Sequence, residues 1–215
     1  MFENDDKKRE KLLDSFSNIL NEDLLHATMN ILALYILVWE AFKKMVIELP
    51  KSFFCINPFL DANGMLKYPE SEEYQEEIGS KGKDLLRSSL RWFVSLHVIT
   101  DDEVEKVLKI RKRRNEFVHE MNKILFEGIS EADCQLFVSL LALYRKIDVW
   151  WIKNVVIDTT PLLEDLDEIK EDEMFNTQAL LIDIMLNVAL GNTTKYKELR
   201  EMIIRLKEQN EKRNN

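Results

Sequence analysis

Three residues near the middle of the chain have side chains that could act together on a phosphate group. Arg114, Asn115 and His119 lie within two turns of each other on any helix that carries them. Arginine has a planar, permanently charged guanidinium that matches phosphate oxygens. Histidine titrates near neutral pH, so it can accept or donate a proton. The combination indicates a site that binds a phosphate and moves a proton.

A single long helix, residues 100–128, is predicted to carry these side chains. Thr100 followed three residues later by Glu103 forms a capping box, and Ile99 and Val104 occupy the positions of a hydrophobic staple. Gly128 is a typical residue at the C-terminal end of a helix.

Helical periodicity gives this helix one apolar stripe, and Arg114 falls near its middle. The stripe consists of Val107, Ile110, Phe117, Val118, Met121 and Leu125. Charged residues on a buried face are usually paired or functional. Glu40 is the candidate partner of Arg114, although it could equally be an exposed helix carboxylate. His119 lies on the flank of the stripe, where it could reach one groove with Arg114 or be an ordinary surface histidine.

A run of basic residues leads into this site. It consists of Lys106, Lys109, Arg111, Lys112, Arg113 and Arg114. We expect Arg111, Lys109 and Arg113 to bind substrate, although Lys112 and Arg113 also suit an outward, solvated face. The whole chain has a formal net charge of −9, which disfavours a protein that coats nucleic acid generally. A local basic patch remains compatible with that charge.

The segment from Arg114 to His119 resembles the R-N-x-x-x-H form of the Rx4–6H motif of HEPN domains. The setting is also similar, because the motif follows basic residues on a long helix, and the resemblance covers roughly residues 22–157. It implies a helical bundle that dimerises around a composite cleft and acts as a metal-independent endoribonuclease in toxin–antitoxin or anti-phage defence. His119 would then be the general acid or base, Arg114 would hold the phosphate, and Asn115 would orient the imidazole or the sugar. Glu40 and Glu120 would support them.

One position departs from the pattern of some family members. Certain HEPN toxins carry a tyrosine two residues after the histidine, which a partner antitoxin modifies, and here that residue is Met121. Control of that kind is therefore in doubt, while a different antitoxin protein remains open. Two other functions also remain open: a non-catalytic binding or regulatory protein of the same fold, and a plain helical dimer scaffold.

Composition and periodicity predict an all-α fold, an up-and-down bundle with a long loop insertion and a C-terminal helical hairpin. Five glycines and four prolines leave few tight turns, and no alternating strand pattern is present. Residues 1–160 are predicted to form the bundle, and residues 161–215 an extension that packs on it or makes a dimer interface. The predicted elements are helices at 24–49, 83–98, 100–128 and 131–157, a connection at 50–82, and an apolar helix at 178–190. Ser130 is the predicted cap of the helix at 131–157, and Gly191 is the predicted stop of the helix at 178–190.

The connection is rich in aromatic residues. Phe53, Phe54, Phe59 and Tyr68 are expected to anchor it on the bundle, and the alternative is an aromatic that stacks on a base. Asp61 to Gly64 is a predicted turn.

No cofactor or metal is expected. Cys55 and Cys134 lack the spacing of metal ligands, and the sequence has neither a phosphate-binding loop nor a zinc-protease motif. The sequence shows no signal peptide, and its most apolar stretch, residues 31–38, is too short to span a membrane. We therefore expect a cytoplasmic protein with RNA, a second copy of itself and an antitoxin as its candidate partners.

Overall fold

The computed structural model describes residues 19–157 and 176–192, together with residues 13, 16–17, 174, 194, 196–198, 200–201 and 204. Helices make up most of this part of the chain, so the predicted all-α fold is confirmed. The chain divides into two compact units, Met1–Met174 and Phe175–Asn215. The predicted boundary at residue 160 lies outside the described residues.

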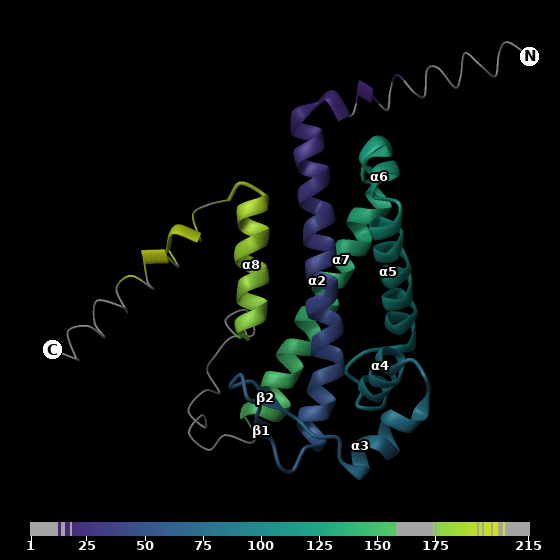
Figure 1. The fold of residues 1–215 in the computed structure, drawn as a ribbon, viewed down its shortest axis with the longest axis vertical. Helices are drawn as coiled ribbons and strands as arrows, with labels where there is room; N and C mark the ends of the chain where they lie inside the picture. Colours follow the sequence, from purple (N-terminus) through teal and green to yellow (C-terminus); the bar gives the residue numbers. More distant parts are fainter. Residues whose placement is uncertain are drawn as a thin grey trace, which may run out of the picture. The chain divides into compact units, whose positions relative to one another are not determined.

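The first unit is built from three long helices and one shorter helix that crosses them (Figure 1). Helices α2 (Glu22–Phe54), α5 (Asp101–His119) and α7 (Glu131–Trp151) run alternately down, up and down. Helix α4 (Leu85–Ser95) is seen nearly end-on in the same view, so it departs from an up-and-down arrangement.

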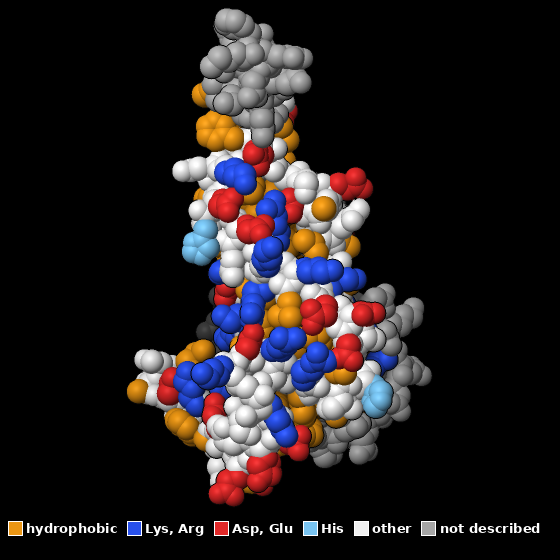
Figure 2. Space-filling model, turned by 90° about the vertical axis from the view of Figure 1, so that its right-hand side faces the viewer, with side chains coloured by type: hydrophobic (Ala, Val, Ile, Leu, Met, Phe, Trp, Pro, Cys, Tyr) orange, Lys and Arg blue, Asp and Glu red, His pale blue; other side chains and the backbone are white. Residues whose placement is uncertain are grey.

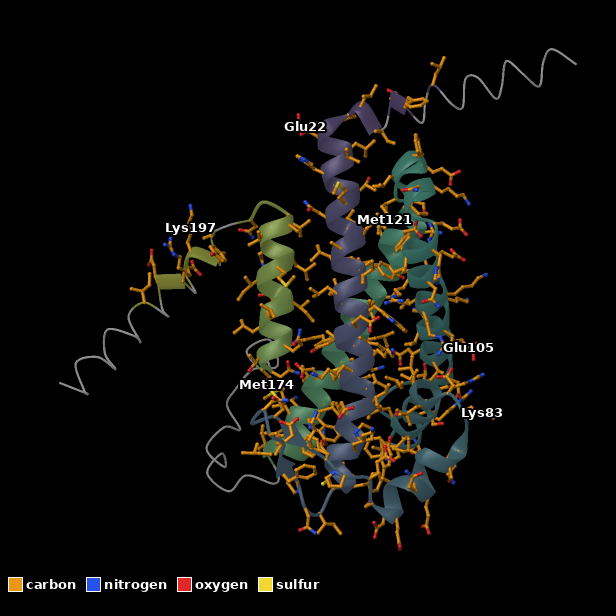
Figure 3. All side chains as sticks on the ribbon, in the orientation of Figure 1. Glu22, Lys83, Glu105, Met121, Met174 and Lys197 are labelled. Carbon is orange, nitrogen blue, oxygen red and sulfur yellow. The ribbon has the colours of Figure 1, made fainter. Side chains whose placement is uncertain are left out.

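Helix α2 is the centre of this unit, because it contacts α4, α5 and α7 as well as two short helices. Tyr35, Val38, Phe42 and Val46 are fully buried on it. Side chains from the surrounding helices fill the space against it, as the stick view shows (Figure 3). Tyr35 makes an edge contact with Phe117 of α5 at 5.0 Å between ring centroids.

A window of α2 is also long and apolar enough to cross a membrane, against the sequence expectation. The core helix of a soluble bundle passes the same test of length and composition. One such helix is therefore weak grounds for a membrane span.

Helix α2 continues through Pro50 to Phe54, whereas its predicted end was residue 49. Proline lacks the N–H that would pair with a preceding carbonyl, which usually ends or kinks a helix. Here aromatic packing compensates, since Phe54 contacts Trp92 at 5.7 Å and Tyr74 at 6.5 Å between ring centroids. Phe53 also packs on Trp92, at 5.6 Å.

The connection after α2 is more ordered than predicted. It contains the antiparallel strands β1 (Phe59–Leu60) and β2 (Leu66–Lys67), helix α3 (Glu72–Glu77) and a 3-10 turn, Gly79–Lys81. The predicted turn at Asp61 is confirmed, because its carboxylate accepts N–H bonds from Asn63 and Met65. Phe59 is 54% exposed, so its expected anchoring role is wrong. Tyr74, 1% exposed, is an anchor that the prediction missed.

Helix α7 begins at the predicted cap, Ser130, and ends in a π-helical segment, Ile152–Ile157. In the second unit, α8 (Thr177–Ala189) matches the predicted apolar helix. Its N-cap is Asn176, and Gly191 follows its end with φ 73°, in agreement with the predicted stop. The second helix of the predicted hairpin falls largely outside the described residues.

Candidate functional site

The start of α5 agrees with the sequence prediction. Thr100 Oγ1 accepts the backbone N–H of Glu103 at 3.2 Å, and the Glu103 carboxylate accepts the N–H of Thr100 at 2.8 Å. Lys146 of α7 also binds this carboxylate at 2.8 Å. Burial raises the pKa of Glu103, but these donors outweigh burial and lower it below the ordinary value. The cap therefore also fixes the start of α5 to α7.

The predicted single helix over residues 100–128 is in fact two helices. Helix α5 ends at His119, Glu120 takes a non-helical conformation at φ −117° and ψ 27°, and α6 (Met121–Glu127) follows. Gly128, with φ 81°, ends α6 rather than the longer helix. The break changes which residues are buried: Val118 and Met121 are 40% and 42% exposed, while Ile124 is buried. The prediction that Val118 and Met121 belong to a buried stripe is therefore wrong.

Arg114 pairs with the carboxylate that the sequence analysis suggested. Its Nη2 lies 2.5 Å from Oε1 of Glu40 on α2, and its Nη1 donates to Asn115 Oδ1 at 3.3 Å. The side chain is 24% exposed, and its Nε is buried without a hydrogen-bond partner among the described residues. The guanidinium therefore has N–H groups that donate no hydrogen bond to any described residue.

Arg114 and Asn115 line an open groove with a volume of about 750 Å³ between α2, α5 and the start of α4. Its remaining lining residues are Trp39, Glu40, Lys43, Ile47, Lys83, Asp84, Leu85, Leu86 and Arg111. We call it the Arg114 groove. Lys and Arg side chains gather in a band over the face that carries α4 and α5 (Figure 2).

Arg111 also belongs to the Arg114 groove, where its Nη1 binds Asp84 Oδ2 at 2.7 Å. Asp84 is the N-cap of α4 and accepts the backbone N–H of Arg87. Burial raises the pKa of Asp84, but the hydrogen bonds from Arg111 and the Arg87 backbone outweigh it and lower the pKa. This carboxylate stays ionised at neutral pH and partly offsets the charge of Arg111.

His119, Lys109 and Glu120 lie outside the groove. His119 is exposed at the last position of α5 and does not line the groove. Lys109 is exposed and lines neither of the two cavities described in this unit. Glu120 is exposed and pairs with Lys123 at 3.1 Å. The structure therefore brings Arg114, Asn115, Arg111 and Glu40 together and leaves the imidazole one turn beyond Asn115.

Arg113 is not an outward, solvated residue as its position suggested. Its Nε and Nη2 bind the two oxygens of Asp133 on α7 at 2.6 and 2.9 Å, and its Nη1 binds Glu116 at 2.8 Å. Its guanidinium also lies 4.6 Å from the ring centroid of Phe117. These contacts hold Arg113 against α7, and it does not line the Arg114 groove, so the geometry gives no support to its expected role in substrate binding.

Four groups that shape this region were not predicted from the sequence. Asp133 lies three residues after the cap Ser130, a spacing that predicts its capping role but not its pairing with Arg113. Asp84, Lys43 and Lys83 reach the Arg114 groove from α2 and the start of α4. These three residues lie near Arg114 only because α2, α4 and α5 cross there. The sequence around each residue does not predict that crossing.

Metal binding by a cluster of side chains receives no support from this geometry. No group of three or more His, Cys, Asp or Glu side chains within the described residues is arranged to hold a metal ion.

Comparison with known proteins does not identify a relative. No protein-family model matches the chain, and no curated protein or solved structure matches it either.

Proposed function

We propose that this protein is a cytoplasmic, metal-independent endoribonuclease of HEPN type, with a role in toxin–antitoxin or phage defence. The observation that carries the proposal is the Arg114 guanidinium, which borders an open groove beside Asn115 and retains unused donors.

Arg114 is suited to a phosphate because its present partner is one carboxylate that is itself half exposed. Glu40 is 47% exposed, and exposed ion pairs are worth only about 0–1 kcal/mol, so a phosphate can displace it. A buried N–H without a partner costs roughly 1–3 kcal/mol, so a shift of the Arg114 side chain that let a phosphate oxygen reach Nε would be favoured. Both effects favour an anion at this guanidinium.

The charge of the Arg114 groove also favours an anion. Lys43, Lys83 and Arg111 line it with Arg114, against the carboxylates of Glu40 and Asp84. Positive groups preorganised around a phosphate stabilise the charge that builds up during its displacement.

His119 is the proposed proton-transfer residue, and a second copy of the chain completes the site. No histidine or cysteine is among the residues that line the Arg114 groove. His119 is exposed, and Val118 and Met121 beside it are apolar and also exposed. In a twofold dimer that buries those two side chains, the His119 residues of both copies would meet at one shared cleft and supply both the acid and the base.

The reaction needs no co-reactant. The ribose 2′-oxygen attacks the adjacent phosphorus while one imidazole takes its proton. The bond from phosphorus to the 5′-oxygen breaks, and a second imidazole, in its protonated form, donates a proton to that oxygen. The products are a 2′,3′-cyclic phosphate and a free 5′-hydroxyl. Arg114 would hold the non-bridging oxygens, and Asn115 would orient the sugar or the imidazole.

The test is cleavage of single-stranded RNA by the purified full chain in the presence of EDTA. His119→Ala and Arg114→Ala should each lower the rate at least about 100-fold, since positioned acid–base catalysis contributes about 10²–10⁴-fold. His26→Ala and Lys112→Ala, which change an exposed histidine and an exposed cation elsewhere in the unit, should cleave normally. A wild-type chain that leaves RNA intact would remove the catalytic proposal.

A second candidate is a non-catalytic RNA-binding or regulatory protein of the same fold. The geometry that favours it is the Glu40 pair on Arg114 together with the absence of His119 from the groove. It predicts RNA binding that depends on Arg114 and is unchanged in His119→Ala.

A further inference from the structure

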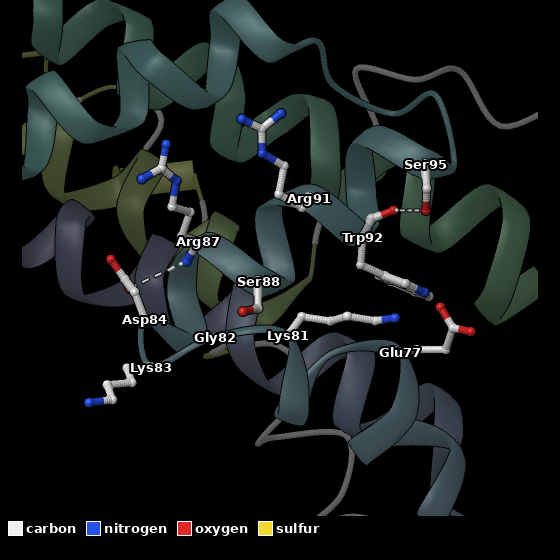
Figure 4. Close-up of a pocket in the computed structure, with 10 residues that line it drawn as sticks. All are labelled: Glu77, Lys81, Gly82, Lys83, Asp84, Arg87, Ser88, Arg91, Trp92 and Ser95. Atoms are coloured by element: carbon white, nitrogen blue, oxygen red, sulfur yellow. Dashed lines mark hydrogen bonds between the residues drawn. The ribbon is translucent and has the colours of Figure 1, made fainter.

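A second cavity adjoins the Arg114 groove at Lys83 and Asp84, which line both. This second cavity has a volume of about 630 Å³ and runs along α4 and the segment that precedes it (Figure 4). We call it the α4 cavity. Its lining residues are Glu77, Lys81, Gly82, Lys83, Asp84, Arg87, Ser88, Arg91, Trp92 and Ser95.

Positive charge is concentrated in these two concavities of an acidic protein. Together they are lined by seven cationic and three acidic side chains, while the whole chain carries a net charge of −9. The cations are Lys43, Lys81, Lys83, Arg87, Arg91, Arg111 and Arg114. A concave surface lined by one sign of charge raises the local concentration of the opposite ion. The ligand expected here is therefore an extended anion.

The cations of the α4 cavity can exchange their present partners for an anion. Arg87 lies 3.5 Å from Glu105 with both side chains more than half exposed, and Arg91 pairs with the exposed Asp101. Such surface pairs contribute about 0–1 kcal/mol. Lys81 and Lys83 make no ion pair with another described residue, and Lys81 extends across the cavity toward Glu77 and Trp92 in Figure 4.

We propose that the α4 cavity binds the phosphodiester backbone of single-stranded RNA that flanks the phosphate held at Arg114. This inference rests on the proposed function, since it places the reacting phosphate in the Arg114 groove. A single strand is flexible enough to follow both concavities past Lys83, whereas a duplex is stiff on this scale. Trp92 is only 7% exposed, so its ring is not available to stack on a base. The contacts are therefore with the sugar–phosphate backbone of the RNA, and such contacts do not depend on the base sequence.

The proposal distinguishes a strand from a small phosphorylated ligand by length. A mononucleotide fills one concavity, whereas an oligomer gains contacts in both. Affinity should therefore rise with length until the strand covers both concavities.

The experiment measures binding of labelled RNA oligomers of about 4 and about 12 nucleotides, lengths typical of single-strand sites. The full chain carries His119→Ala so that RNA stays intact, and the buffer contains EDTA. Adding Lys81→Gln and Arg87→Gln should lower the affinity for the longer oligomer about tenfold and leave the shorter one unchanged. The slope of log affinity against log salt should fall by about 1.4, since each phosphate contact on a single strand contributes about 0.7.

The matched control removes two exposed cations that line neither concavity, Lys112→Gln with Lys123→Gln. An equal loss in this control, the same affinity for both oligomers, or ATP binding as tightly as the longer oligomer would each overturn the inference. The thermal unfolding midpoint of each variant checks that it is folded.

Cleavage assays with His119 intact separate this inference from the proposed function. If the Lys81→Gln, Arg87→Gln chain cleaves RNA and binds the longer oligomer like wild type, the subsite is wrong and the ribonuclease stands. If that chain loses the longer oligomer while no chain cleaves RNA, the subsite stands and the catalytic proposal fails.

Discussion

Arg113 and Asp133 join α5 to α7 through a two-point ion pair, with N–O distances of 2.6 and 2.9 Å. Asp133 is 3% exposed, and it also accepts hydrogen bonds from the backbone N–H and the hydroxyl of Ser130. The next residue, Arg114, pairs with Glu40 on α2 instead. Two consecutive arginines therefore bind two different helices, which fixes the rotation of α5 and the direction of Arg114.

Arg113→Ala should lower the free energy of unfolding by about 2–4 kcal/mol, because it leaves the Asp133 carboxylate buried without its counter-charge. Urea unfolding followed by circular dichroism measures the change. Lys112→Ala, at a side chain that is 82% exposed, should stay within about 0.5 kcal/mol of wild type. Similar stabilities for the two variants would mean that the Arg113 pair does not hold α5 in place.

Acid should weaken the same contact. Burial raises the pKa of Asp133, but hydrogen bonds from Arg113 and Ser130 lower it below its ordinary value of 3.8. When the pKa of a carboxyl is lower in the folded state than in the unfolded state, the charged group stabilises the fold at any pH above its unfolded pKa. That stabilisation is lost as the pH falls through the folded pKa. Wild type should therefore lose stability below about pH 4. Asp133→Asn should lose less over that range, and parallel curves for the two chains would contradict the assignment.

Glu40→Gln should strengthen RNA binding by up to about fivefold, because the exposed ion pair that competes with phosphate contributes at most about 1 kcal/mol. Fluorescence anisotropy in the His119→Ala chain measures it. Glu76→Gln removes an exposed carboxylate of α3 that lines neither concavity, and it should have no such effect. Weaker binding by Glu40→Gln would show that Glu40 positions Arg114 for RNA rather than competing with it.

Glu103→Ala should destabilise the protein by about 1–2 kcal/mol, because it removes both the cap at Thr100 and the contact with Lys146. Glu105→Ala, two residues later and 57% exposed, is the matched control and should cost less than about 0.5 kcal/mol. The difference between their thermal midpoints tests whether this capping box supports α5.

The helix ends were predicted well where a capping residue or a glycine stop could be recognised in the sequence. The caps at Thr100 and Ser130 and the stop at Gly191 depend on neighbouring residues, and all three agree with the structure. The predictions at Pro50 and at residues 119–121 failed. At Pro50 the outcome depends on aromatic partners far away in the chain. At Glu120 the sequence has no glycine or proline that would mark the break.

Part of the candidate site could also be predicted from the sequence, and part could not. The Arg114–Glu40 pair followed from a charge on an apolar stripe and a carboxylate on the most apolar helix. The roles of Arg113 and Arg114 could not be separated, because adjacent residues differ by only 100° around the axis and either could face the neighbouring helix. The position of α4 across the bundle decides which cations share a groove with Arg114, and helical periodicity carries no information about it.

Lys83 and Asp84 form a shared wall between the two concavities, and this has a thermodynamic consequence. A ligand that shifts either side chain in one concavity changes the affinity of the other, and linkage requires the effect to be reciprocal and equal in magnitude. A small anion bound in one concavity would therefore raise or lower the affinity of the other concavity for its ligand. The sign of the effect depends on how the anion moves Lys83 and Asp84.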